Sequence, residues 1–173
     1  AAAGAIEPLV ALVRDGDAKG KANAAGVLWN LVVGDVAIVS ANAAAGAIEP
    51  LVALVRDGDR EGKANAAGAL GNLAFGDDAV KAAIAAAGAI EPLVALVRDG
   101  DAQGKVKAAG ALGNLAVGDD ANKAAIAAAG AIEPLVALVR DGDAQGKVKA
   151  ASALENLAVG NDAIKAAIAT AFN

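Results

Sequence analysis

Residues 4–17 read Gly-Ala-Ile-Glu-Pro-Leu-Val-Ala-Leu-Val-Arg-Asp-Gly-Asp, and this stretch occurs four times in the 173-residue chain. Its proline falls at a constant spacing of 42 residues, at Pro8, Pro50, Pro92 and Pro134. A fixed period of roughly 40 to 47 residues is typical of stacked helical units, because each unit buries its apolar face against its neighbours. The repeated stretch therefore predicts a solenoid and not a globule with one closed core.

The third unit carries the clearest helix signals. Asp119 precedes residues 120–129, whose acidic start and following glycine predict a short helix. Residues 131–140 predict a middle helix with proline in its first turn, where the missing N–H costs nothing. Asp143 is placed to cap a long third helix. We therefore expect an all-α fold with a short, a middle and a long helix in every 42 residues.

We expect one solenoid domain over residues 1–173. Its repeats fall at approximately 1–45, 46–87, 88–129 and 130–173. The first repeat should lack most of its short helix, with Ala1 to Gly4 as the tail of one, and the chain should end with an extra short helix. A lone repeat holds few large aliphatic side chains to offset the entropy of ordering it, so repeats should fold only when stacked.

Composition excludes several classes of function. The chain has no histidine, cysteine or tyrosine, and its only hydroxyls are on Ser40, Ser152 and Thr170, so we expect no catalytic residues and no cofactor. The net charge of −5 argues against a nucleic acid partner. Charged residues interrupt every apolar run, which argues against a membrane partner.

One acidic turn resembles the start of a calcium-binding EF-hand loop. Asp15, Gly16 and Asp17 have the loop's opening pattern, but its twelfth position is Gly26 and not the bidentate glutamate that calcium requires. We interpret the segment as a turn followed by a helix N-cap, and we expect no metal site.

The long helix should carry a polar stripe. At 100° per residue, Leu112 and Leu115 point inward, whereas Asn114 lies on the outer side. Lys107 falls within about 20° of Asn114, because seven residues make nearly two turns. The same asparagine position recurs in every unit, so the stripe should run along the whole array.

Two motifs give the chain a family resemblance. The patterns Gly-Ala-Ile-x-Pro-Leu-Val-x-Leu-Val and Ala-Ala-Gly-Ala-Leu-x-Asn-Leu-Ala, with the three-helix period, resemble armadillo repeats over essentially the whole chain. The resemblance implies a right-handed superhelix, a right-handed α-solenoid, whose long helices line a concave groove. It also implies that an asparagine ladder binds the main chain of an extended peptide, through Asn30, Asn72, Asn114 and Asn156. A carboxamide suits that role because it offers both a donor and an acceptor.

The stripe departs from nuclear-import armadillo proteins in two respects. Those proteins place a lysine-gripping tryptophan four residues before each ladder asparagine, where this chain has Gly26, Gly68, Gly110 and Ser152. The stripe also begins with Asn23 and Asn65 and continues with Lys107 and Lys149, so its second half is basic. That pattern is more similar to catenin-type grooves and predicts a preference for acidic peptides near the C-terminal half.

Two positions have alternative interpretations. Trp29, beside Asn30, is either a binding anchor at the groove edge or a packing residue against a neighbouring long helix. Asn42 occupies the inward position that isoleucine fills in the other short helices, so we expect residues 36–45 to be rotated, shifted or loosened.

Two functions are consistent with these patterns. One is a weak and poorly selective peptide-binding scaffold, with the nine candidate residues Asn23, Trp29, Asn30, Asn65, Asn72, Lys107, Asn114, Lys149 and Asn156. The other is a structural or engineered repeat protein that has no evolved ligand and mainly folds and self-associates head to tail.

Overall fold

A computed structural model describes residues 3–31 and 36–173, and these residues form twelve helices and no strand. Each unit contributes a middle, a long and a short helix in that order. The middle helices are α1 (Ala3–Asp15), α4 (Ile48–Asp57), α7 (Ile90–Asp99) and α10 (Ile132–Asp141). The long helices are α2 (Ala18–Leu31), α5 (Arg60–Leu73), α8 (Ala102–Ala116) and α11 (Ala144–Ala158). The short helices are α3 (Val36–Ala44), α6 (Asp78–Ala86), α9 (Asp120–Ala128) and α12 (Asp162–Phe172).

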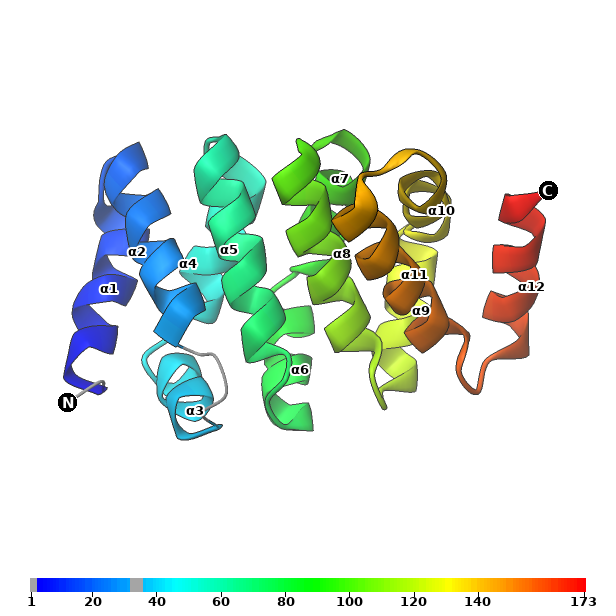
Figure 1. The fold of residues 1–173 in the computed structure, drawn as a ribbon. Coiled ribbons are helices and arrows are strands. Elements are labelled where there is room, and N and C mark those ends of the chain that lie inside the picture. The colour runs from blue at the N-terminus through cyan, green and yellow to red at the C-terminus, as the bar shows by residue number, and fades with distance from the viewer. Residues whose placement is uncertain (1–2, 32–35) are drawn as a thin grey trace.

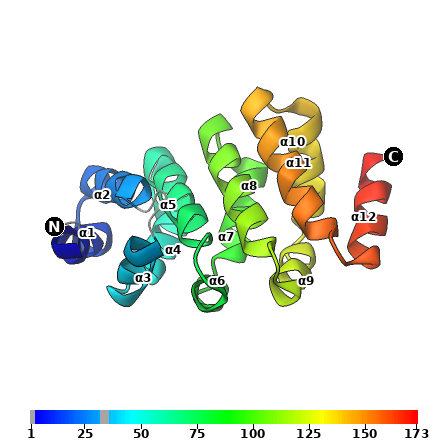
Figure 2. The ribbon, with the colours of Figure 1, turned by 60° about the horizontal axis from the view of Figure 1, so that its bottom comes forward.

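The units stack along one axis, with the two termini at opposite ends (Figure 1). The long helices form one layer, the middle helices lie beside and behind them, and α3, α6 and α9 follow one edge (Figure 1, Figure 2). Each long helix packs against the long helix of the next unit, from α2 through α5 and α8 to α11. The predicted all-α solenoid with three helices per unit is therefore confirmed.

Acidic residues begin the long helices as predicted. The side chains of Asp59, Asp101 and Asp143 each accept a hydrogen bond from the backbone N–H three residues later, at 2.7–2.8 Å. Asp17 makes the same bond to the N–H of Gly20 at 2.7 Å. An aspartate in this position satisfies an unpaired helix donor and suits the positive end of the helix dipole. The N-cap interpretation of the turn at Asp17 is thus confirmed.

Glycine makes the turn between the short and middle helices. The chain bends by 78°, 75° and 80° where α3, α6 and α9 give way to the middle helices that follow. The turning residues Gly46, Gly88 and Gly130 have φ of 72°, 76° and 78°. This left-handed conformation strongly favours glycine, because a β-carbon would clash with the backbone.

Small residues let the long helices approach one another closely. A β-carbon on Gly71 would lie 3.3 Å from the Cα of Ala111, and one on Gly113 would lie 3.2 Å from the Cα of Ala153. Alanines in α5, α8 and α11 are fully buried at these contacts, and the inward Leu112 is 0% exposed. The long helices therefore meet through close backbone approach at these contacts, beside a core of buried large aliphatic side chains such as Leu112.

The start of the chain differs from the prediction. Ala3 and Gly4 are not the tail of a short helix, because α1 begins at Ala3 and runs unbroken to Asp15 with Pro8 inside it. Proline cannot donate to the carbonyl of Gly4, so α1 lacks one helical hydrogen bond. The glycine turn of the other units joins a short helix to a middle helix, and no such pair precedes α1 in the part of the chain that the structure describes.

The expectation of a displaced first short helix is wrong. Shifted by 42 residues, the bounds of α3 coincide with those of α6, and Asn42 is as buried as Ile84, at 1% and 0% exposure. The Nδ2 of Asn42 donates to the carbonyl of Ile38 at 2.8 Å, and its Oδ1 has no hydrogen-bond partner among the described residues. Val39 of the same helix is buried and packs beside Gly76, which lies between α5 and α6.

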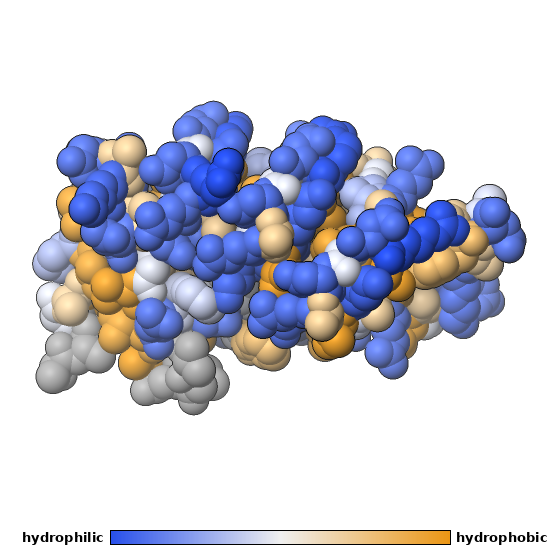
Figure 3. Space-filling view, turned by 45° about the horizontal axis from the view of Figure 1, so that its top comes forward, coloured by the Kyte–Doolittle hydropathy of each residue, from blue (hydrophilic) through white to orange (hydrophobic). Residues whose placement is uncertain are grey.

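The surface is mixed in polarity. Hydrophilic side chains cover most of the face seen in Figure 3, with apolar patches between them. The exposed large apolar residues within the described ranges are Leu12, Val27, Phe75, Val117, Val148, Val159 and Phe172. No single described helix is long and apolar enough to cross a membrane, although the three bent short–middle pairs meet that test of length and composition when each pair is taken together.

Candidate peptide-binding face

The predicted site residues all lie on the long helices, on a surface that we call the long-helix face. Asn23 and Asn30 on α2 are exposed, and so is Lys149 on α11. The other six are half-buried: Trp29, Asn65, Asn72, Lys107, Asn114 and Asn156. Because successive long helices pack side by side, this face continues across all four units (Figure 1).

The asparagines join adjacent units. The Nδ2 atoms of Asn72, Asn114 and Asn156 donate to the main-chain carbonyls of Trp29, Gly71 and Gly113, at 2.9, 2.8 and 3.1 Å. Each acceptor lies 43 residues earlier, in the long helix of the preceding unit. These side chains therefore contribute to stacking, a role that the sequence interpretation missed because it requires the docking of two helices.

The side-chain oxygen of each of these asparagines remains for other contacts. Within the described residues, the Oδ1 atoms of Asn72, Asn114 and Asn156 accept no hydrogen bond, and these side chains are half-buried. Asn65 repeats the arrangement about two helical turns before Asn72, donating to the carbonyl of Ala22 at 3.0 Å. The inter-unit bond fixes the side-chain orientation, so the oxygens form a regular row of acceptors.

Trp29 packs across a boundary between units. A β-carbon on Gly68 of α5 would lie 3.2–3.3 Å from three atoms of the indole, so one ring face lies against that helix. The Nζ of Lys107 lies over the ring, 3.5 Å from its centroid. Trp29 therefore packs against the neighbouring long helix, as one of its two interpretations predicted. It also receives a cation–π contact from Lys107 of α8.

The basic half of the stripe holds two neighbouring ammonium groups. Burial, and after it the charge of Lys149, lowers the pKa of the Lys107 ammonium below its ordinary value of 10.5. Lys149 lies beside Gly110, where a β-carbon would be 3.7 Å from its Cδ. No ion pair involves either lysine within the described residues. Two like charges without an acidic partner favour an anionic group from elsewhere.

A second set of inter-unit bonds was also missed. Lys81 and Lys123 are buried, and their ammonium groups donate to the carbonyls of Val117 and Val159 in the next unit, each at 2.9 Å. Aspartates three residues earlier pair with them, at 3.2 and 2.8 Å. The only sequence signal is that lysine recurs at a position where the first unit has Val39.

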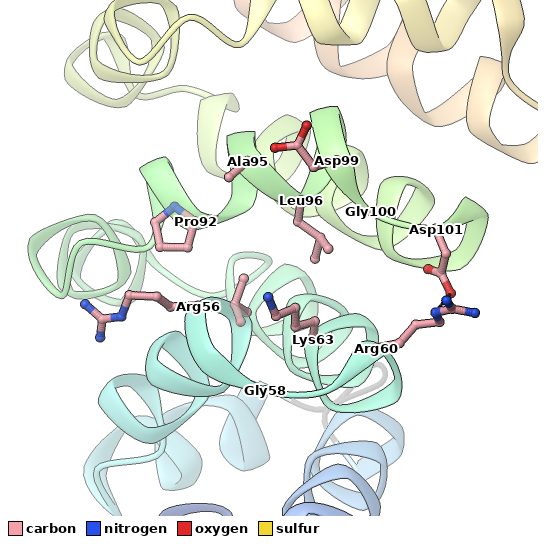
Figure 4. A pocket seen from close by; sticks show the side chains of 11 residues that line it. Arg56, Gly58, Arg60, Lys63, Pro92, Ala95, Leu96, Asp99, Gly100 and Asp101 are labelled. Carbon is pink, nitrogen blue, oxygen red and sulfur yellow. Dashed lines mark ion pairs between the residues drawn. The ribbon is translucent and has the colours of Figure 1, made fainter.

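Two cavities lie away from the long-helix face. The larger, about 590 Å³, has Arg56 and Lys63 on one wall and Pro92 and Leu96 on the other (Figure 4). The smaller, about 370 Å³, is lined by residues at largely equivalent positions one unit later. Both linings mix acidic and basic groups without a nucleophile and base pair. The cavities recur because the stacking of units recurs.

The described residues contain no group of three or more acidic or cysteine side chains that could hold a metal ion. The acidic side chains at the helix starts are used as N-caps or ion-pair partners of nearby lysines. The chemistry available on the long-helix face is therefore hydrogen bonding and charge complementarity.

The fold and this face define a class, the α-solenoid with a regular polar stripe on its long helices. Residues 1–33, 43–75, 77–117 and 119–159 match the Armadillo/beta-catenin-like repeat family. The chain belongs to the armadillo repeat family. No curated protein sequence matches it.

Solved structures with the same fold include designed proteins. One is an engineered protein with 36% sequence identity to this chain and a TM-score of 0.90. The match covers 96% of this chain and 69% of the engineered protein. A designed armadillo repeat protein in complex with the peptide (KR)4 is 32% identical with a TM-score of 0.89, covering 97% and 70%. A third comprises computationally designed armadillo repeat proteins for modular peptide recognition, at 33% identity, a TM-score of 0.89 and coverages of 97% and 71%.

Proposed function

We propose that this chain is a non-catalytic scaffold that holds the main chain of an extended peptide on its long-helix face. The observation that carries this proposal is the row of asparagine Oδ1 atoms, oriented by the bonds from Nδ2 to the preceding unit. Peptide N–H groups are the complementary donors, and a main-chain contact does not depend on the ligand's side chains. The designed relatives that bind or recognise peptides support the proposal.

Binding should be weak. A net contribution of about 0.5–1.5 kcal/mol for each of four asparagines sums to about 2–6 kcal/mol, whereas micromolar affinity needs about 8 kcal/mol. Selectivity comes from the basic half of the stripe, where Lys107 and Lys149 attract acidic ligand side chains. We therefore expect acidic peptides to bind best, with their acidic residues near the C-terminal half of the array.

The test is a titration of an extended glutamate-rich peptide, followed by calorimetry and by the fluorescence of Trp29. The wild type should saturate, and the double variant N114A/N156A should bind several-fold more weakly. Because these asparagines also join units, circular dichroism must show that the double variant is folded at the titration temperature. The matched control is T170A, which alters an exposed polar side chain on α12, away from the long-helix face.

Two results would oppose the proposal. One is no saturable binding by the folded wild type. The other is an equal affinity for N114A/N156A and T170A, because removing oxygens that hold the peptide must weaken binding.

A second candidate function is head-to-tail self-association, without any evolved ligand. It is favoured by Val148, which is 66% exposed, whereas Val106 at the equivalent position one unit earlier is 5% exposed. Inside the array, the following unit covers the position of Val106. The first unit of a second copy could cover Val148 in the same way. Sedimentation across a concentration series should then show oligomers that V148K disrupts. A strict monomer at high micromolar concentration would exclude this candidate.

A further inference from the structure

The indole of Trp29 connects three units of the long-helix face. The main-chain carbonyl of Trp29 accepts the hydrogen bond from Asn72, one ring face lies against α5 at Gly68, and the ammonium of Lys107 lies over the ring. It is the only tryptophan in the chain, so it supplies the one indole surface that a ligand cation can use.

Lys107 occupies the position that a cationic ligand side chain would take. Its Nζ is 3.5 Å from the ring centroid, within the range of about 6 Å in which the ring quadrupole attracts a cation. An incoming lysine or arginine must first displace this ammonium. It must also approach Lys149, whose charge already acts on Lys107.

An acidic ligand side chain meets the opposite situation. A carboxylate beside Lys107 and Lys149 relieves the repulsion between two ammonium groups, neither of which has an ion-pair partner within the described residues. The lysine stem is flexible, so Lys107 can turn from the indole toward such a carboxylate. Binding of an acidic residue would then uncover the ring.

We propose that Lys107 is a built-in occupant of the Trp29 indole that rejects cationic ligand side chains and is drawn off the ring by acidic ones. The proposal deepens the peptide-binding function above and depends on it. It makes Lys107 a specificity-determining residue and Trp29 its sensor.

The experiment compares two peptides on four proteins. The probes are (Lys-Arg)4 and (Glu-Ala)4, and the proteins are the wild type, K107M, K149M and the control K63M. Methionine retains much of the stem but removes the charge, and Lys63 lies off the long-helix face beside the larger cavity. Affinity is measured by calorimetry, and the environment of Trp29 by its fluorescence.

We expect K107M to change the fluorescence of the free protein, because the ammonium no longer covers the ring. K107M should bind (Lys-Arg)4 about two- to fivefold more tightly than the wild type and (Glu-Ala)4 more weakly by a similar factor. K149M should weaken (Glu-Ala)4 binding while leaving the fluorescence of the free protein unchanged. K63M should match the wild type with both peptides.

The outcomes separate this inference from the function on which it depends. If (Glu-Ala)4 binds the wild type without altering Trp29 fluorescence, or if K107M and K63M give equal affinities for both peptides, the role of Lys107 is wrong and peptide binding stands. If neither peptide binds any of the four folded proteins, both proposals fail.

Discussion

The boundary between units 1 and 2 is built differently from the two boundaries that follow. At the first, Val39 packs beside Gly76 and Trp29 lies over Gly68. At the later ones, Lys81 and Lys123 donate to carbonyls of the next unit, and glycines at the position of Trp29 meet the opposite helix backbone. The same architecture is thus held by large apolar contacts at one boundary and by close approach with buried ammonium groups at the others.

The comparison shows which parts of a repeat the fold requires. All three boundaries keep the asparagine-to-carbonyl bond across 43 residues, although the residues around it change. A large side chain at one boundary and a close backbone approach at another can therefore fill the same contact between units. The inter-unit polar bond is common to every boundary.

The largest expected effect comes from exchanging the inward residues of the first two short helices. I84N should destabilise the protein by about 3–5 kcal/mol, because it removes a buried aliphatic side chain and buries an amide. N42I should stabilise by about 1–3 kcal/mol, since it removes the unpaired Oδ1 of Asn42. Urea unfolding followed by circular dichroism measures both. Opposite signs are required, and a destabilising N42I would mean that α3 depends on the bond from Asn42 to Ile38.

The next effect tests the bond that all boundaries share. N114D should destabilise by about 1–3 kcal/mol, because a carboxylate cannot donate to the carbonyl of Gly71 and places negative charge beside it. The control Q103E makes the same change of charge at an exposed position of α8, where we expect less than about 0.5 kcal/mol. Equal unfolding midpoints for the two variants would show that the asparagine bond contributes nothing to stacking.

A smaller effect should come from the buried lysines. K123M removes the bond to the carbonyl of Val159, and we expect a loss of about 1 kcal/mol, since water can reach that exposed end of α11. K165M is the matched control, because Lys165 at the equivalent position is half-exposed and pairs with Asp162 only through a surface contact. Thermal unfolding should separate the two variants, and a K165M loss as large as that of K123M would contradict the comparison.

Sequence predicted the architecture because the signals that set it are local and repeated. The aspartate caps, the glycine turns and the inward leucines each act within a few residues, and Asp143, Gly130 and Leu112 lie where expected. The candidate residues also share one face, since the helical period places Lys107 and Asn114 together.

Contacts between units could not be predicted in the same way. The bond from Asn114 to Gly71 and the stack of Lys107 on Trp29 depend on the distance and register between two docked helices. Asn42 misled the sequence interpretation for a related reason. The buried amide did not displace α3, which packs Val39 beside Gly76 of the next unit.

The smallest effect tests whether close approach is needed at the later boundaries. G110A should stabilise by about 0.5–1 kcal/mol, because alanine is the better helix former and its β-carbon would meet only the Cδ of Lys149, at 3.7 Å. In G113A the same gain is opposed, because the new β-carbon would lie 3.2 Å from the Cα of Ala153 and α11 would have to move. G113A should therefore be less stable than G110A in urea unfolding. If the two variants gain equally, the boundary between α8 and α11 can widen without loss, and the contrast with the boundary at Trp29 reflects side-chain size alone.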